Sequence, residues 1–440
     1  MGCRQIIKDN LNCYAKISAN NYKIVSILLL FGLALILRIH HLDHEGLWMD
    51  EIRQTSFYSH TLFEIVYDAA STHQPPLDYW IGPFIHFFSA GDFAVRLPAA
   101  LFGAGSVVML VVLISQMCSW NVAVGFGIIF ALLPFHLYYS QEARPYAIVV
   151  FLLLCVFWIL NSFLSRDRKK KIFPVLTLLF FSTIFLYSRS LSPLVVTASL
   201  LLILASWLFF LFLKADPKDN KKKKHLIILS CGTLIIALGF CLPSLRIILA
   251  KSVRYVPDTA LRLNMDSLIS VIIKFDLAPI WQAYVVQSEP ITYPLLLLVS
   301  LSPYIGWRLN LYRKNTIWGL TTLLLPITCI LNLFIFQSKS NMPFRPAYAS
   351  YILPLAIVLG AVSIQGLWTL TATNRYVQIT RGLILVLAAI FSVQTVMATI
   401  DYKKMKRKSD WRGVAGYLTN NYDVRHVLSL IHISEPTRLC

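Results

Sequence analysis

Two adjacent carboxylates, Asp50 and Glu51, stand in the segment Leu47-Trp48-Met49-Asp50-Glu51. One member of such a pair can serve as a general base toward a hydroxyl or an amine. Trp48 suits a sugar-facing or interfacial position, because its ring is apolar and its N–H is polar. The bare pattern fits equally well two solvated loop acids or the start of a helix, so both interpretations stay open at this point.

A second segment, His73-Gln74-Pro75-Pro76-Leu77-Asp78-Tyr79-Trp80, carries groups that could bind a phosphate or a hydroxyl. The two prolines restrict the backbone to an extended turn. Such a turn could hold His73 and Gln74 toward a ligand before an aromatic helix begins. The alternative is a rigid loop-to-helix junction without a binding role.

A third segment, Tyr138-Tyr139-Ser140-Gln141-Glu142-Ala143-Arg144-Pro145-Tyr146, places an anion, a cation and several hydroxyls in one short turn. Arg144 could bind a phosphate, and Glu142 could orient either that arginine or a substrate. A Glu–Arg pair that caps a helical hairpin is the alternative. Further candidate cations, each of which could instead be an anchor to lipid headgroups, are Arg96, Arg189 and Arg345.

The elements that must position these residues are membrane helices. The chain has 440 residues, of which 57% are hydrophobic and only 14% are charged, and its mean hydropathy is +0.64. Soluble proteins are about 25% charged, so this composition excludes an ordinary water-soluble enzyme. The net charge of +19 collects in short loops, as the positive-inside rule predicts for the cytoplasmic loops of a membrane protein. This distribution argues against nucleic-acid binding.

The apolar blocks predict an all-α polytopic membrane protein with about 11 transmembrane helices. Basic residues before the first span and in loops 165–171 and 214–224 place the N-terminus in the cytoplasm. Loops 42–95 and 246–290 are then external, and the first of them is acidic and carries interfacial helical pieces such as residues 79–88. The expected spans are 23–41, 96–115, 120–138, 146–164, 172–188, 190–213, 225–245, 291–307, 316–336, 347–367 and 380–400.

The two ends of the chain need separate treatment. Residues 1–22 form a basic cytoplasmic arm without a cleavable signal peptide. The basic run 403–408 follows an odd number of spans, so either one span is miscounted or these residues meet headgroups at the outer face, which we favour. Residues 428–440 include the string LSLIHISEPTR, which looks like a translated sequencing adapter, and we expect the native chain to continue differently. The eight cysteines suggest no disulfide framework.

Together these segments resemble the family 39 glycosyltransferases of the GT-C superfamily, which include protein O-mannosyltransferases and lipid A aminoarabinose transferases. The resemblance rests on an ordered set of motifs, each of them loose when taken alone, that extends over about 400 residues. The motifs are LWMDE at 47–51, HQPPLDYW at 73–80, VRLPAALFG at 95–103, ALLPFHLYYSQEARPYA at 131–147, YILPL at 351–355 and DWRGVAGYL at 410–418.

The resemblance implies a GT-C catalytic domain over residues 23–401 and the start of an external C-terminal domain at 402–427. It implies an inverting transferase that moves a sugar from a polyprenyl-phosphate donor to an acceptor outside a plasma or inner membrane. Asp50 matches the family's catalytic base, and Glu51 is its motif neighbour. The implied donor-phosphate ligands are Arg144, His73, Gln74 and, with a departure from the family's Arg-Tyr pattern, Arg345; the implied substrate-binding residues are Trp48, Glu142, Tyr139 and Tyr146.

Several properties stay open in the sequence. The acceptor could be a glycan, a lipid or a protein, and no residue cluster demands a divalent cation, although some members of the family use one. A transporter or flippase of lipid-linked sugars is the alternative function. That alternative is disfavoured because the expected spans contain no Asp or Glu.

Overall fold

The computed structural model describes residues 2–56, 58, 60–61, 64, 77–88, 91–165 and 352–370, together with isolated positions from 382 to 420. Every element in this part of the chain is an α-helix, in agreement with the expected fold class. The helices are α1 (Gly2–Ile39), α2 (Met49–Thr55), α4 (Leu77–Phe88), α5 (Asp92–Ser115), α6 (Trp120–Leu132), α7 (Pro134–Tyr139), α8 (Tyr146–Ser165) and α17 (Ile352–Leu370).

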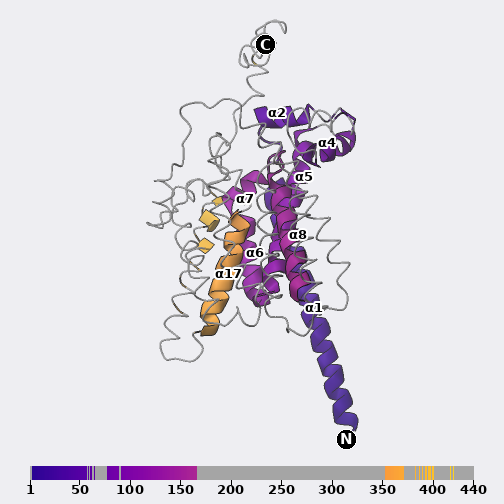
Figure 1. Ribbon diagram of the computed structural model, residues 1–440, viewed down its shortest axis with the longest axis vertical. Coiled ribbons are helices and arrows are strands. Elements are labelled where there is room, and N and C mark those ends of the chain that lie inside the picture. The colour runs from indigo at the N-terminus through magenta and orange to yellow at the C-terminus, as the bar shows by residue number, and fades with distance from the viewer. Residues whose placement is uncertain are drawn as a thin grey trace, which may run out of the picture.

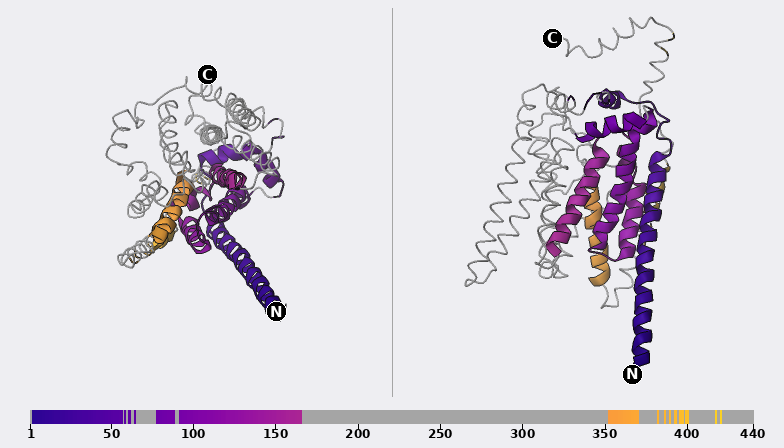
Figure 2. Two further views of the ribbon diagram at one scale, coloured as in Figure 1. Left: turned by 60° about the horizontal axis from the view of Figure 1, so that its bottom comes forward. Right: turned by 90° about the vertical axis from the view of Figure 1, so that its right-hand side faces the viewer.

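The long helices α1, α5, α6, α8 and α17 run alongside one another, and α2 and α4 lie at the end of this bundle opposite the N-terminus (Figure 1; Figure 2, right). Helix α5 is central, because it contacts α1, α4, α6, α7, α8 and α17. Its small residues Ala100 and Ala104 are fully buried. Small side chains allow helix backbones to approach closely, which is how membrane helices gain contact area.

Two described helical segments, Asn21–Ile39 and Asp92–Ser115, are long and apolar enough to cross a membrane, and three shorter ones are apolar. Together with the composition, these segments support an integral membrane protein. The count of 11 spans stays a prediction, because the five expected spans from 172–188 to 316–336 lie outside the described residues. The described positions within the last expected span, 380–400, are helical.

The boundaries of several expected elements differ from the observed ones. The first helix begins at Gly2 and therefore includes the expected cytoplasmic arm. The expected span 120–138 is two helices, because Leu133 is extended (φ −61°, ψ 121°) between α6 and α7. The cause is Pro134, whose ring disfavours a helical conformation at the residue before it.

The interfacial piece expected at 79–88 is helix α4, which starts at Leu77. Trp80 and Phe84, four positions apart on one face, are exposed, whereas Ile81 packs against the main core. An amphipathic helix with this exposure fits a position at the membrane surface.

The structure describes two thiols, and both are free. Cys118 lies in the turn between α5 and α6, and Cys155 is buried in α8. Burial raises the pKa of the Cys118 thiol to about 12. At neutral pH this thiol therefore stays protonated and reacts poorly with electrophiles.

Replacing Gly127 by alanine is expected to destabilise the bundle by about 1–3 kcal/mol, because an added methyl group overpacks a close helix contact. A Cβ atom at this position would lie 2.3 Å from a methyl carbon of Val111 in α5 and 2.8 Å from one of Leu30 in α1. The measurement is the midpoint of thermal unfolding of the detergent-solubilised protein.

Gly125, two residues away in the same helix, is the matched control. A Cβ atom there would meet nothing within 4 Å, so Gly125→Ala should leave the midpoint unchanged or raise it slightly. Equal midpoints for the two variants would show that the contact of α6 with α1 and α5 is loose.

Candidate functional site

The three segments singled out in the sequence come together, as far as they are described, at the end of the bundle that carries α2 and α4. The segment 47–51 forms the entry and first turn of α2, and the segment 138–146 forms the turn between α7 and α8. Leu77 to Trp80 of the second segment begin α4. His73 and Gln74, as well as Arg189 and Arg345, lie outside the described residues.

Asp50 and Glu51 are the second and third residues of α2, with Trp48 at the N-cap position. The Trp48 backbone N–H donates to Glu51 Oε2 at 3.2 Å, which is one half of a capping box. Trp48 is half-buried, and its indole N–H is buried without a hydrogen-bond partner among the described residues. The sequence thus folds locally into a short helix whose first turn contains the carboxylate pair.

Glu51 is fully buried and forms an ion pair with Arg96 of α5, with 2.7 Å between Arg96 Nη2 and Glu51 Oε2. Arg96 Nε also donates to Glu51 Oε1 at 2.9 Å. This bidentate geometry is the strongest form of an arginine–carboxylate contact. Arg96 is therefore not a headgroup anchor, which was one interpretation of its position in the sequence.

The turn between α7 and α8 lies directly against α2. The backbone N–H of Ala143 donates to Glu51 Oε1 at 2.9 Å. Arg144 Nη1 donates to Gln54 Oε1 of α2 at 3.4 Å. Because residues four apart share one helix face, position 50 of α2 lies on the face whose Gln54 contacts Arg144.

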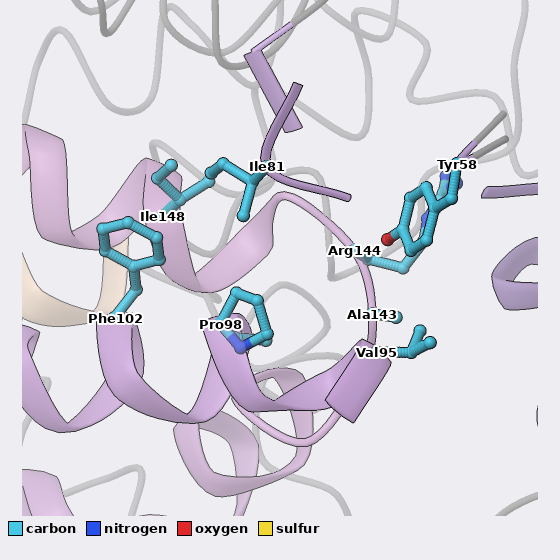
Figure 3. A pocket seen from close by; sticks show the side chains of 9 residues that line it. Tyr58, Ile81, Val95, Pro98, Phe102, Ala143, Arg144 and Ile148 are labelled. Atoms are coloured by element: carbon cyan, nitrogen blue, oxygen red, sulfur yellow. The ribbon is translucent and has the colours of Figure 1, made fainter. Parts of the chain in front are cut away.

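Arg144 also lines a small cavity of about 20 Å³ between α4, α5 and α8. Figure 3 shows Ile81, Phe102 and Ile148 on one side of this cavity and Tyr58 and Arg144 on the other. A cavity of this size holds about one water molecule, so a larger ligand requires side chains to move. The remaining lining residues are Val95, Pro98, Ala99 and Ala143.

Tyrosine rings cover the same turn. Tyr139 meets Tyr146 edge-on with 4.8 Å between the ring centroids, and it meets Tyr138 at 4.9 Å. Tyr146 is buried and Tyr139 is half-buried, whereas Glu142 is 1% exposed. Two of the substrate-binding residues expected from the sequence, Tyr139 and Tyr146, therefore touch each other, and Glu142 lies in the same turn.

A buried polar network that sequence reasoning missed lies beneath this turn. Arg38, at the end of α1, donates through Nη2 to His136 Nδ1 at 2.5 Å, and His136 Nε2 lies 3.2 Å from Ser106 Oγ. A guanidinium group only donates, so Nδ1 must accept and Nε2 must carry the proton. The imidazole is therefore neutral and donates to Ser106. A histidine within an apolar span was the signal that could have found this network.

The network also holds the turn in place. Gln141 Nε2 donates to the carbonyl oxygen of Arg38 at 2.7 Å and to that of His40 at 3.2 Å. A Cβ atom at Gly103 would lie 2.2 Å from Ser140 Oγ, so only glycine lets α5 approach the turn this closely. The end of α1, the middle of α5 and the turn before α8 are thus fixed to one another.

No group of three or more His, Cys, Asp or Glu side chains among the described residues is placed to bind a metal ion.

Comparison with known proteins identifies the fold. No protein-family model and no curated relative matches the sequence. The structure is similar to the Archaeoglobus fulgidus oligosaccharyltransferase in complex with Zn and sulfate, with a TM-score of 0.55 and 11% identity over 90% of this chain. It matches the same archaeal enzyme, AglB, in complex with an inhibitory peptide and a dolichol-phosphate, with a TM-score of 0.55, 11% identity and 94% of this chain covered.

A further similar structure is that of ArnT from Cupriavidus metallidurans in the apo state, with a TM-score of 0.50 and 13% identity over 87% of this chain and 76% of ArnT. The chain spans 55% of the oligosaccharyltransferase in the Zn and sulfate complex and 60% of it in the dolichol-phosphate complex. The chain therefore shares the fold of these two transferases, while the assignment to the GT-C superfamily and to its family 39 stays a prediction.

Proposed function

We propose that the protein is a membrane glycosyltransferase that moves a sugar from a polyprenyl-phosphate donor to an acceptor outside the membrane. The observation that carries the proposal is the contact between Arg144 and the face of α2 on which position 50 lies. It brings the expected phosphate ligand and the expected base to the same end of the bundle. The fold shared with these two transferases, one of them solved with a dolichol-phosphate, supports the same function.

The small cavity beside Arg144 would have to widen through side-chain movement to admit a lipid-phosphate donor, and we propose that it does so. Its side chains are apolar apart from Tyr58 and Arg144. A polyprenyl phosphate has the complementary form, because its chain is apolar and its head is an anion. A guanidinium group binds phosphate oxygens through two parallel hydrogen bonds. We expect Arg345, His73 and Gln74 to complete the phosphate site, and Trp48, Glu142, Tyr139 and Tyr146 to contact the substrates.

The proposed reaction is a single displacement with inversion. Asp50 accepts the proton of the acceptor hydroxyl as the acceptor oxygen forms a bond to the anomeric carbon. The bond between that carbon and the phosphate oxygen breaks, and its electron pair leaves with the lipid phosphate. Arg144 stabilises the charge that develops on this leaving group. The leaving phosphate is a stable anion, so the reaction needs little acid catalysis.

The function is tested with the full chain in membranes and a panel of radiolabelled polyprenyl-phosphate hexoses and pentoses. We expect label to leave the lipid-phosphate pool and to enter a glycan, lipid or protein fraction with at least one donor. Undecaprenyl phosphate should also raise the midpoint of thermal unfolding, since a ligand that binds only the folded state stabilises it. Absence of both effects would refute the proposal.

Replacing Arg144 by alanine is expected to lower kcat/KM for the donor about 10- to 150-fold, because a hydrogen bond to a charged group contributes about 1.5–3 kcal/mol. Arg144→Lys should lower kcat/KM less, because lysine keeps the positive charge but cannot form two parallel hydrogen bonds to the phosphate. The measurement is the initial rate of transfer at varied donor concentration.

The control for this substitution is Lys23→Ala. Lys23 is a cation on the same bundle, near the N-terminal end of α6, where its Nζ lies 5.7 Å from the centroid of the Trp120 ring. Its loss should leave the donor kinetics unchanged. If both KM and kcat for the donor also stay unchanged in Arg144→Ala, the arginine has a structural role and is not the phosphate ligand.

A further inference from the structure

The carboxylate of Glu51 has no acceptor position left for a substrate proton. Its Oε1 accepts from Arg96 Nε and from the Ala143 N–H, each at 2.9 Å. Its Oε2 accepts from Arg96 Nη2 at 2.7 Å and from the Trp48 N–H at 3.2 Å. A carboxylate offers about four acceptor sites, and all four are filled. Glu51 would have to break one of these bonds before it could take a proton from an acceptor.

Arg96 is saturated in the same way. Besides its two bonds to Glu51, it donates through Nη1 to the carbonyl oxygens of Leu42 and Glu45, both at 2.7 Å, and through Nη2 to that of Gly46 at 2.9 Å. A guanidinium group has five N–H donors, and every one of them is used. Lysine could not replace it, because an ammonium group offers three donors from a single atom.

This pair joins three segments that are distant in the sequence. Arg96 belongs to α5, the three carbonyl groups belong to the loop that leads into α2, and Ala143 belongs to the turn before α8. Glu51 directly follows Asp50, and Ala143 directly precedes Arg144. The hydrogen bond from the Ala143 N–H to Glu51 therefore has the expected base next to its acceptor residue and the expected phosphate ligand next to its donor residue.

We propose that Glu51 and Arg96 are positioning residues that set the distance between the start of α2 and the turn at 143–144. The inference rests on the proposed function, because the two groups to be positioned are the base and the phosphate ligand of that reaction. It gives Glu51 a role other than that of the base. Displacement of the lipid phosphate from the sugar by the acceptor oxygen requires the base and the leaving-group ligand to be held in a fixed relation. Errors of about 1 Å in such an arrangement can cost about 100-fold in rate.

The decisive variant is Glu51→Gln in the full chain reconstituted in nanodiscs. Glutamine has the same size as glutamate, but one of the two oxygens is replaced by an NH₂ group. Each oxygen of Glu51 accepts from two N–H groups, so the NH₂ group faces two donors whichever way the amide is turned, and at least two of the four hydrogen bonds are lost. Amide hydrogen exchange should accelerate about tenfold or more in the segments 46–54 and 140–146 together. The value of kcat per folded molecule should fall about 100-fold, whereas the pH–rate profile should keep its acidic limb.

Ser115→Ala is the matched control, because its hydroxyl bonds only within the opposite end of α5, the helix that carries Arg96. It should change neither the exchange nor kcat. Arg96→Lys is the second variant, and it should accelerate exchange in the same two segments even if Glu51→Gln does not fold.

The outcomes separate this inference from the proposed function. Acceleration of exchange in both segments together supports the positioning role. If the wild-type protein transfers no sugar, that finding refutes the proposed function alone. Exchange that rises in one segment alone, or a kcat per folded molecule equal to that of the wild type, would overturn the positioning role. Loss of the acidic limb in Glu51→Gln would overturn it as well, since Glu51 would then be the base.

Discussion

Replacing Asp50 by asparagine is expected to reduce sugar transfer by about 100- to 10,000-fold, the range that a positioned general base contributes. Asparagine has nearly the same shape as aspartate, but its amide cannot accept the proton of an acceptor hydroxyl. Position 50 is in the first turn of α2, next to the saturated carboxylate of Glu51. The protein should therefore still fold. The measurement is the initial rate of label transfer in membranes with matched amounts of wild-type and variant protein.

Asp43→Asn is the control for this substitution. Asp43 is an exposed carboxylate of the same acidic loop, seven positions before Asp50. It should tolerate the same loss of charge without a change in rate, which separates a general effect of loop charge from a specific effect of the base. Full activity of Asp50→Asn would refute the assignment of the base and leave the identity of the proton acceptor open.

Much of the fold could be predicted from apolar periodicity and length. The spans expected at 96–115, 146–164 and 347–367 correspond to α5, α8 and α17, with bounds that differ by up to five residues. These segments are predictable because a long apolar run has few alternatives to a membrane helix. Helix ends are less certain, because they depend on local capping and on contacts with other parts of the chain.

The sequence analysis did not predict the end of α6 before Leu133, although Pro134, which disfavours a helical residue before it, carried the signal. Hydropathy alone hides such a break, because leucine and proline both fit within an apolar run. The stretch up to Tyr139 therefore looked like the end of one long span, although it forms the separate helix α7.

The candidate site could be predicted in part. Motif spacing identified the segments around Asp50 and Arg144, and the structure places both segments at one end of the bundle. What the sequence could not show is which charged residues pair with one another. Glu51 and Arg96 are 45 positions apart, and an arginine at the start of a span looks the same whether it meets a lipid headgroup or a buried glutamate.

Removal of Arg96 is expected to have the largest effect on stability. Arg96→Met should destabilise the protein by about 3–5 kcal/mol, because it leaves the charge of Glu51 buried without its counter-ion. It also leaves the carbonyl oxygens of Leu42, Glu45 and Gly46 without the donors that they have in the wild type. The measurement is the unfolding midpoint of the detergent-solubilised protein, converted to free energy where unfolding is reversible.

A double-mutant cycle with Glu51→Leu distinguishes the ion pair from the rest of this contact. The double variant removes both buried charges, so it should be more stable than the sum of the two single losses predicts, by about 0.5–3 kcal/mol. It should still be less stable than the wild type, because the Ala143 N–H loses its acceptor and three loop carbonyls lose their donor. Strict additivity of the two losses would mean that Glu51 and Arg96 do not form a pair in the folded protein, and the argument that this carboxylate holds α2 against the turn at 143–144 would fail with it.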